Sequence, residues 1–328
     1  MGMERAGVTF ASLMGLGPDT ALRTARLAEE IGYDSYWTAE TTGPEAFSLL
    51  GAVGAAAPSL GLGTGVLALQ LRTPMVVAMA GATLQALHPE RDIVLGVGIS
   101  SPVVATRWHG APYSDRPLAH TREYVTLLRQ CLTGEKVDFA GDFYEVKGFR
   151  LGVRLGERRP KIVIGALNPK MLQLAGEVAD GVALNYLPAS HVAWSVEQVR
   201  KGGPAEIYAY VHDGVCEREE GLELARRDLF SYAVVDSYAR SFERAGFADE
   251  VAAIRAHHVD GDRAGALAAV SDRMVDAIDV MGDADAVHAT MRAYVDAGVD
   301  VPVLMPLPWG ADRQASADLA IRAAVGSA

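Results

Sequence analysis

The chain has 328 residues, of which 50% are hydrophobic and 22% are charged, and its formal net charge is −11. This apolar fraction is ample for a buried core and excludes a disordered chain. The negative balance argues against duplex nucleic acid as the main ligand, because binding to phosphates needs a basic face. The two cysteines, Cys131 and Cys216, are too few for a disulfide framework or a cysteine-based zinc site.

The ends and the hydropathy of the chain bear on its location. Residues 1–6 lack the apolar stretch of a signal peptide, and no window holds eighteen uninterrupted apolar residues. We therefore expect a soluble cytoplasmic protein without a membrane partner. The length fits two ordinary domains or one large barrel with insertions.

The first hundred residues alternate between strand-like and helix-like segments. Each predicted strand is continuously apolar, which is typical of parallel strands with both faces covered. The spacing predicts strands over 6–10, 33–38, 60–67 and 92–98, and helices over 19–31, 44–57 and 74–87.

Two longer segments interrupt this alternation in the rest of the chain. Residues 99–158 begin as a long loop, continue as a helix over 117–133 and end as a glycine-rich, hairpin-like excursion, while residues 217–297 are almost entirely helical in pattern. Between and after them the alternation resumes, with strands over 161–164, 181–184, 206–211 and 301–307 and helices over 169–178, 190–200 and 311–325.

The count of eight strands and at least eight helices predicts an α/β fold, a (β/α)8 TIM barrel. We expect one domain over residues 1–328, with insertions at 99–158 after the fourth strand and at 217–297 after the seventh. A doubly wound sheet is the alternative, but it seldom needs eight steps. The second insertion is expected to cap the site or to form a dimer contact.

Barrel active sites are built at the C-terminal ends of the strands. No H-E-x-x-H motif occurs among the eight histidines and no G-x-S-x-G elbow is present, so no metal site or serine nucleophile is predicted. The strand-end candidates are Ser12, 40–42, 65–69, 98–101, 165–168, Asn185, His212 and 306–309.

Glycines alternate along the third and fourth strands. Gly61, Gly63 and Gly65 share one face of the third strand, and Gly96 and Gly98 follow on the fourth. Such a face lets a flat ligand or another backbone come close, and tight packing at a bend of the barrel explains the pattern equally well. The spacing differs from the dinucleotide-binding G-x-G-x-x-G motif.

The start of the helix after the fifth strand is a possible anion site. Asn168 suits an N-cap and Pro169 the first helical position, so the free amides of this helix would face the strand ends, where they can bind phosphate. Lys170 adds a positive charge nearby. The same pattern also describes an ordinary capped helix.

Three side chains near strand ends can exchange protons. Glu40 ends the second strand, His212 ends the seventh, and His109 lies in the loop after the fourth. For each single histidine a structural hydrogen bond is the more common role. An acid at the mouth of an apolar strand needs a partner.

Taken together, these segments resemble the luciferase-like flavin and deazaflavin oxidoreductases, and they are most similar to the coenzyme F420-dependent branch of actinobacteria. The resemblance covers residues 6–185 well and thins through 217–297. The matching segments are 36–40, 62–66, 72–74, 95–100, 116–124, 165–171 and 174–181.

The resemblance implies a deazaflavin ring lying over the strand ends. It also implies a bulge on the third strand with a non-proline cis peptide bond, which corresponds to Gly65–Val66, and a cofactor phosphate at the start of the helix after the fifth strand. The residues expected to bind the cofactor are Ser12, Thr38, Gly65, Val66, Gly98, Ser100, Gly165, Ala166, Leu167, Asn168, Pro169 and Lys170.

One position departs from the family pattern. Many relatives carry a histidine directly after the acid that ends the second strand, and this chain has Thr41 there. A histidine-dependent mechanism is therefore not transferred, and the proton is expected from Glu40, His109, a tyrosine of the insertion or water. Glu40, Thr41 and His109 are the candidate catalytic residues.

The resemblance favours an F420-dependent oxidoreductase that transfers hydride between the deazaflavin C5 and a small organic substrate. Reduction of a C=C or C=N bond is the first expectation, and oxidation of an alcohol is the other direction. Arg72, Arg107 or Lys170 is expected to meet the anionic cofactor tail, and family habit suggests a homodimer.

Two alternatives stay open. One is an FMN-dependent reductase or monooxygenase of the same family, although Ile99 and Ser100 stand where flavin-using luciferases carry an arginine. The other is a non-redox lyase or isomerase, which predicts a catalytic lysine at a strand end where none is found.

Overall fold

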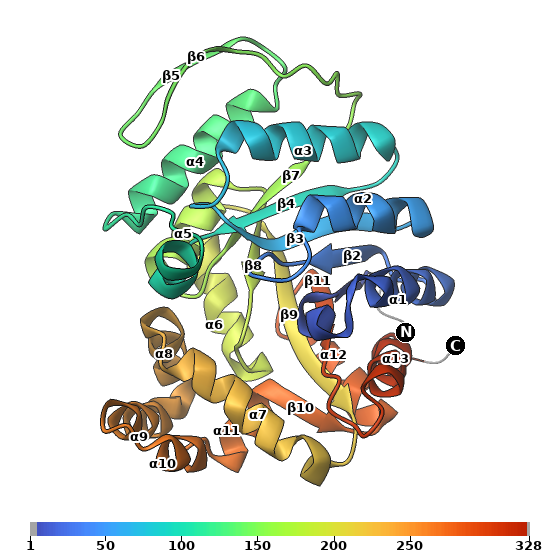
Figure 1. Cartoon of the computed structure of the whole chain (residues 1–328), viewed down its shortest axis with the longest axis vertical. Coiled ribbons are helices and arrows are strands. Elements are labelled where there is room, and N and C mark those ends of the chain that lie inside the picture. The colour runs from blue at the N-terminus through green and yellow to red at the C-terminus, as the bar shows by residue number, and fades with distance from the viewer. Residues whose placement is uncertain (1–4, 327–328) are drawn as a thin grey trace.

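A computed structural model describes residues 5–326, so the outermost residues of the expected 1–328 domain and most of the segment 1–6 lie outside the described residues. Within this range eight parallel strands close into a ring in the order β9-β11-β1-β2-β3-β4-β7-β8 and back to β9, which confirms the predicted TIM barrel (Figure 1). The strands are β1 (Gly7–Thr9), β2 (Ser35–Thr38), β3 (Gly61–Ala68), β4 (Ile93–Gly98), β7 (Lys161–Gly165), β8 (Gly181–Leu184), β9 (Glu206–Val215) and β11 (Val301–Pro306).

A helix follows each barrel strand and covers the outside of the ring. Four of these helices begin with proline at the first turn, where its missing N–H costs nothing. The second begins at Ala46, because the Glu45 carboxylate accepts hydrogen bonds from the amides of Phe47 and Ser48 and caps it. The helices are α1 (Pro18–Ile31), α2 (Ala46–Ala56), α3 (Pro74–Leu87), α4 (Pro117–Cys131), α5 (Pro169–Val178), α6 (Ala189–Arg200), α12 (Ala284–Asp296) and α13 (Arg313–Ala324).

Large aromatic rings fill the interior of the barrel. Trp37 and Tyr208 lie with ring centroids 5.2 Å apart, and Tyr210 and four buried valines join them in the same cluster. The glycines of β3 make room for these rings, because a Cβ on Gly63 would lie 2.5 Å from Trp37 and one on Gly65 would lie 2.0 Å from the Tyr210 hydroxyl. At these two positions the structure therefore supports tight packing and corrects the idea of a bare glycine surface beneath a flat ligand.

The third strand carries the expected irregularity. Its register with β4 shifts between Thr64 and Leu67, and the Gly65–Val66 peptide bond is cis. The Val66 side chain lies against two other glycines, since a Cβ on Gly98 would be 3.0 Å and one on Gly165 3.1 Å from its methyl groups. Val66 itself stays partly exposed, so its side chain forms the surface above β4 and β7.

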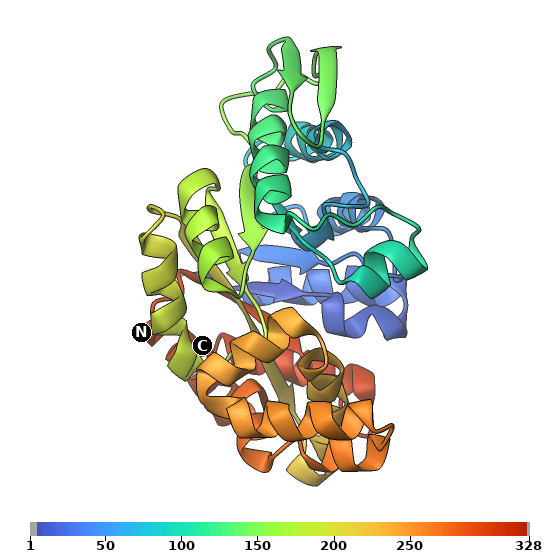
Figure 2. The ribbon, with the colours of Figure 1, turned by 90° about the vertical axis from the view of Figure 1, so that its left-hand side faces the viewer.

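The first insertion contains two elements beyond α4. A π-helical turn, Val103–Trp108, lies in the stretch expected to be an irregular loop. The strands β5 (Val137–Ala140) and β6 (Glu145–Phe149) form the predicted hairpin, and Figures 1 and 2 both show it at one end of the long axis of the molecule.

The second insertion lies at the opposite end of that axis and is not purely helical (Figure 2). It contains a strand, β10 (Asp279–Gly282), which pairs in parallel with His212–Val215 at the C-terminal end of β9. This pairing depends on residues far apart in the chain, so the local helical pattern of residues 217–297 did not predict it. The segment from α7 to β10 is called the helical block below, and its helices are α7 (Arg218–Ala233), α8 (Asp236–Phe242), a π-helical segment (Glu243–Phe247), α9 (Ala248–Val259), α10 (Arg263–Ala268) and α11 (Asp272–Ile278).

The helical block has an apolar core of its own, which includes Phe242, Ile254 and Met274. Tyr186, from the loop after β8, is the barrel residue that belongs to this core. Among the described residues, no helix is both long and apolar enough to cross a membrane.

The packing of the glycine strands predicts a large difference between two Gly→Ala substitutions. A Cβ at Gly96 would meet the Thr64 carbonyl oxygen at 1.9 Å, whereas one at Gly51 of α2 meets nothing within 4 Å. We expect Gly96→Ala to lower the free energy of unfolding by about 1–3 kcal/mol or more through overpacking. Gly51→Ala should raise it by about 0.5–1 kcal/mol through the lower entropy of the unfolded chain. Urea denaturation measures both values, and equal effects would contradict this packing.

Candidate active site

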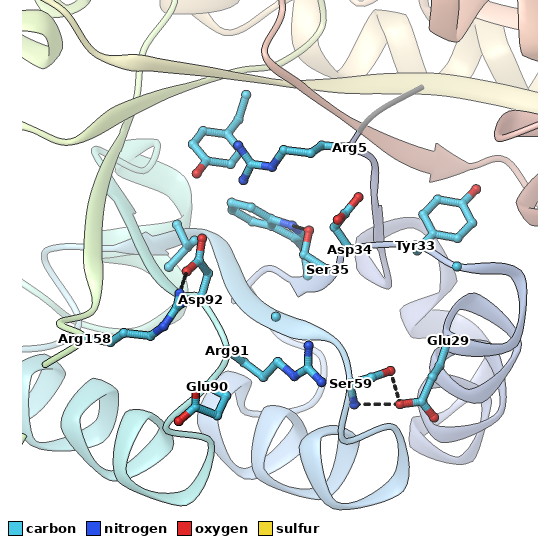
Figure 3. A pocket seen from close by; sticks show the side chains of 15 residues that line it. Arg5, Glu29, Tyr33, Asp34, Ser35, Ser59, Glu90, Arg91, Asp92 and Arg158 are labelled. Atoms are coloured by element: carbon cyan, nitrogen blue, oxygen red, sulfur yellow. Dashed lines mark hydrogen bonds and ion pairs between the residues drawn. The ribbon is translucent and has the colours of Figure 1, made fainter. Parts of the chain in front are cut away.

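One cavity lies at the N-terminal end of the barrel and has a volume of about 430 Å³. Figure 3 shows its lining, in which charged side chains already have partners. Arg158 donates to Asp92 at 2.7 Å, and Glu29 accepts a hydrogen bond of 2.7 Å from the backbone amide of Ser59. This end of a TIM barrel serves stability, whereas chemistry takes place at the other end. We therefore do not assign the active site to this cavity.

The second cavity, the mouth cavity, has a volume of about 270 Å³ and lies at the C-terminal ends of the strands. Ser12 lines it just after β1 and donates a hydrogen bond of 2.6 Å to the Pro306 carbonyl at the end of β11. The other lining residues come from four segments: Ala11, Tyr186, Asp228, Tyr232, Met305, Leu307, Pro308, Trp309 and Arg313. The ring of strand ends around it is called the barrel mouth below.

Glu40, at the end of β2, is held by a guanidinium. Arg72 Nε donates to its Oε2 at 2.8 Å and Arg72 Nη2 to its Oε1 at 2.6 Å, and Nη2 also contacts Glu45 at 2.5 Å. Hydrogen bonding to Glu40 raises the pKa of Arg72 above its ordinary value. Both oxygens of Glu40 are thus used to fix the β2 and β3 loops, and Arg72 is committed to carboxylates rather than to a cofactor tail.

The structure brings the two other candidate catalytic residues together. The His109 Nε2 donates to the Thr41 carbonyl oxygen at 2.7 Å, which joins the loop after β4 to the loop after β2. Both residues are exposed, and Thr41 directly follows Glu40 in the chain. None of the three lines the mouth cavity.

The α5 N-terminus has a different cap from the one predicted. Asn168 occupies the N-cap position and Pro169 follows it, but the Asn168 side chain makes no capping hydrogen bond. Its amide donates to the Ser237 carbonyl at 3.1 Å, and its Oδ1 accepts from Arg244, both in the helical block. The first-turn amides of α5 are therefore left without the expected side-chain cap.

Arg244 is the cation that sequence reasoning missed at this helix start. Its guanidinium contacts only neutral oxygens here, those of Leu167 and Asn168, and stacks over the Trp194 ring at 5.5 Å. Its Nε is buried and has no hydrogen-bond partner. Burial, together with repulsion from Arg240, lowers the pKa of Arg244 below its ordinary value. No local pattern points to this residue, because its position depends on how the helical block folds back.

A buried polar cluster lies at the C-terminal end of β9. His212 Nδ1 lies 3.1 Å from Asp279 Oδ1 of β10, and His212 Nε2 lies 2.8 Å from Asn185 Oδ1. Asn185 and His212 are both strand-end candidates from the sequence, whereas Asp279 lies within the segment expected to be helical. The carboxylate of Asp228 completes the cluster, and it accepts a 2.8 Å hydrogen bond from the Tyr186 hydroxyl.

The donor atoms of His212, Asp228 and Asp279 all lie within 4.8 Å of one another, close enough to hold a metal ion together. The motif search could not find such a set, since its members are distant in sequence. Both nitrogens of the imidazole are, however, already engaged by protein oxygen atoms.

Other residues expected to bind a cofactor lie at varied depths. Thr38 is fully buried, so its side chain is not accessible from the barrel mouth, and Gly98 is covered by Val66. The Ser100 backbone amide donates a hydrogen bond to the side-chain oxygen Oε1 of Gln70 at 3.4 Å. The direct cofactor contacts predicted for Thr38 and Gly98 are therefore not carried further. Accessible positions are Val66, Ser100, Gly165, Leu167, Asn168, Pro169 and Lys170, whereas Gly65 and Ala166 are buried.

Comparison with known proteins gives the family. The model of the luciferase-like monooxygenase family matches residues 6–301. A Mycobacterium tuberculosis protein named as a coenzyme F420-dependent oxidoreductase is 28% identical over 88% of this chain and 90% of its own. The 5,10-methylenetetrahydromethanopterin reductase of Archaeoglobus fulgidus is 29% identical over 90% of this chain and 91% of its own.

A solved structure shows the same fold. The F420-dependent tetrahydromethanopterin reductase of Methanopyrus kandleri superposes with a TM-score of 0.79, at 21% identity, over 97% of this chain and 96% of that one. The chain therefore belongs to the luciferase-like monooxygenase family, and it is an oxidoreductase, as the sequence predicts.

The pair between Glu40 and Arg72 predicts a stability effect that can be measured by a double-mutant cycle. We expect Arg72→Met to lower the free energy of unfolding by about 1–3 kcal/mol, because it leaves a carboxylate that is only 12% exposed without its donors. Adding Glu40→Gln should restore part of the loss. The matched control is Arg227→Met, which breaks an exposed pair with Glu223 and should cost less than about 0.5 kcal/mol. Equal costs would contradict a buried role for this pair.

Proposed function

We propose that the protein is a coenzyme F420-dependent oxidoreductase that acts on a small organic substrate in the mouth cavity. The observation that carries the proposal is the start of α5, where the Arg244 guanidinium contacts Asn168 and, among the described residues, forms no ion pair and leaves its buried Nε without a hydrogen bond. The resemblance expects the cofactor phosphate at this same helix start. The relatives named for F420 over nine-tenths of their length support the same cofactor.

The residues present fit an anionic cofactor tail. An anion near Leu167, Asn168 and Pro169 would meet helix amides at the positive end of the α5 dipole. It would also give the buried Nε of Arg244 the partner that it lacks. Lys170 is exposed at the same helix start and adds a second cation. This is where we propose that the tail binds.

The barrel mouth then offers two faces to the ring system. Val66 presents a partly exposed apolar side chain on the β3 bulge, supported from behind by Gly98 and Gly165. The mouth cavity, whose lining combines aromatic and apolar groups with Ser12, Asp228 and Arg313, would hold the substrate. When bound, F420 supplies the two-electron hydride chemistry, and the chain supplies position and a dry site.

The direction of the reaction and the substrate belong to this proposal. Reduction of a C=C or C=N bond is the first choice, and oxidation of an alcohol is the second. An FMN-dependent reaction is the competing assignment, because the family is named for luciferase-like monooxygenases. The relatives reported above are named for redox reactions, so they do not favour the non-redox lyase or isomerase.

Parallel titrations with F420 and FMN test the cofactor assignment. We expect F420 to bind at least about tenfold more tightly than FMN, with an affinity that falls as salt rises because the tail is an anion. Arg244→Met should weaken F420 binding by about tenfold or more, since a charge-assisted hydrogen bond contributes about 1.5–3 kcal/mol. Fluorescence of each cofactor provides the readout.

The control for this titration is Arg263→Met. Arg263 also stacks over an aromatic ring of the helical block, Phe230 at 5.5 Å, but it lies on α10 and not at the α5 N-terminus. F420 affinity should be unchanged in this variant. Tight FMN binding with oxygen consumption by the reduced enzyme would instead favour the flavin assignment.

A further inference from the structure

We propose that Asp228, assisted by the hydroxyl of Tyr186, is the catalytic group that exchanges a proton with the substrate in the mouth cavity. The inference rests on the proposed function and names the proton donor that the replacement of a histidine by Thr41 leaves open. It is argued from the geometry of α7, the loop after β8 and the polar cluster behind them.

Asp228 and Tyr186 both face the space where a substrate would lie. Both residues line the mouth cavity, together with Tyr232 one turn further along α7. The Tyr186 hydroxyl donates to Asp228 Oδ2 at 2.8 Å, which leaves Oδ1 for another partner. The Asp228 side chain is largely buried and keeps part of its surface open to the cavity. A carboxyl group in this position can reach a substrate while staying shielded from bulk water.

The position of Tyr186 is fixed from three directions. Its backbone has φ +49°, an uncommon conformation for a residue other than glycine that is typically retained where structure or function requires it. Its ring lies 4.1 Å from the His212 ring and 3.8 Å from the Tyr232 ring, between centroids. The ring also meets Tyr238 of α8 edge-on at 5.7 Å. This packing restricts the Tyr186 ring and so keeps its hydroxyl within hydrogen-bond distance of Asp228.

The cluster behind Asp228 contains two buried titratable residues, His212 and Asp279. Asn185 Oδ1 accepts a hydrogen bond from the Tyr186 amide at 3.0 Å, so it is also the acceptor for His212 Nε2, and that nitrogen carries a hydrogen. Burial lowers the pKa of His212 to about 4 and raises the pKa of Asp279 well above its usual range. Burial therefore disfavours the charged form of both residues.

Asp228 lies next to this pair, and both of its members act on the pKa of Asp228. Burial, and after it the neighbouring Asp279, raise the pKa of Asp228, while His212 and the Tyr186 hydrogen bond lower it, and the net result is a pKa of about 7. A group that is half protonated near neutral pH suits general acid–base catalysis. The titratable and charged groups that face this carboxyl are His212 of β9, Asp279 of β10, Tyr186, Tyr232 of α7, Tyr238 of α8 and Arg313 across the cavity.

The other candidates are committed elsewhere. Glu40 uses both carboxylate oxygens on Arg72, and the His109 Nε2–H is donated to the Thr41 carbonyl. Neither residue lines the mouth cavity. Among the residues that line it, Asp228 is the carboxylic acid.

The step balances in the reducing direction. The substrate carbon gains a hydride, which is one proton with two electrons, from reduced F420, and the cofactor would thereby be oxidised by two electrons. The π bond of the substrate breaks, its electron pair moves to the neighbouring atom, and that atom takes the proton of Asp228. The O–H bond of Asp228 breaks, the electron pair stays on the carboxylate, and Tyr186 stabilises it until solvent returns the proton. In the oxidising direction the same carboxylate accepts the proton of the alcohol.

Three variants test the inference with F420 and any substrate that the wild-type enzyme turns over. Asp228→Asn should lower kcat by about a hundredfold or more with a small change in KM, as expected for loss of a general acid or base. The matched control is Glu223→Gln, which makes the same change on the exposed face of α7 and should keep kcat. Tyr186→Phe is the second variant, and it keeps Asp228.

The pH profile distinguishes catalysis from a structural role. In the reducing direction the acid form is active, so kcat should fall as pH rises through about 7, the pKa of Asp228. In the oxidising direction it should fall as pH drops below that value. This limb should vanish in Asp228→Asn. In Tyr186→Phe it should move to higher pH, because the lost hydrogen bond had lowered the pKa of Asp228.

A readout without cofactor completes the test. The infrared C=O band of a protonated carboxyl in the wild-type protein should titrate with a midpoint near 7 and be missing in Asp228→Asn. F420 binding with an unchanged pH limb in a folded Asp228→Asn overturns this inference alone. No F420 binding by the wild-type protein overturns the proposed function and this inference with it. A stoichiometric metal ion that is lost in Asp228→Asn also overturns it, since the cluster would then be a metal site.

Discussion

The length of β9 is the constraint on which the barrel mouth depends. This strand has ten residues, and its neighbours β8 and β11 together cover only part of it. On the edge that β8 leaves free, His212–Val215 pairs with β10, so the chain returns to the barrel at the end of the helical block. A strand edge left open is a liability, and covering it with β10 satisfies its backbone groups.

This pairing determines which side chains meet at the barrel mouth. It buries Asp279 against His212, and it fixes the helical block so that Asp228 reaches Tyr186 and Arg244 reaches the start of α5. Two different electrostatic environments result. The partly buried Asp228 and the fully buried Asp279 lie beside the mouth cavity, which Arg313 also lines, while the Arg244 guanidinium lies at a helix N-terminus and forms no ion pair among the described residues. The proposed anion binding and proton exchange thus depend on two residues of one inserted segment, Arg244 and Asp228.

The glycines on β3, β4 and β7 make room for large neighbouring side chains and do not form an open glycine surface beneath a ligand. Their missing side chains create space for Trp37 and Tyr210 below and for Val66 above. Because close packing tolerates few voids, each of these large groups needs a glycine opposite it. The surface that a cofactor ring would meet is consequently an apolar side chain on a bulge, held by backbone on its far side.

Sequence alone determined the features that depend on local order. Continuous apolar runs predicted the eight strands, Pro169 was expected at the first position of α5, and the resemblance located the cis bond at Gly65–Val66. Glu40, Thr41 and His109 were also found, because they directly follow strands or lie in their loops.

Tertiary structure decided the rest, for a physical reason that no local pattern carries. The helix propensity of residues 217–297 does not reveal β10, since a strand at this position is stabilised only by its partner on β9. Asn168 reads as a cap, yet its side chain binds Ser237 and Arg244 because the helical block brings them within reach. Asp228 and Tyr186 share no sequence motif. They form a hydrogen-bonded pair only because the helical block packs against the loop after β8.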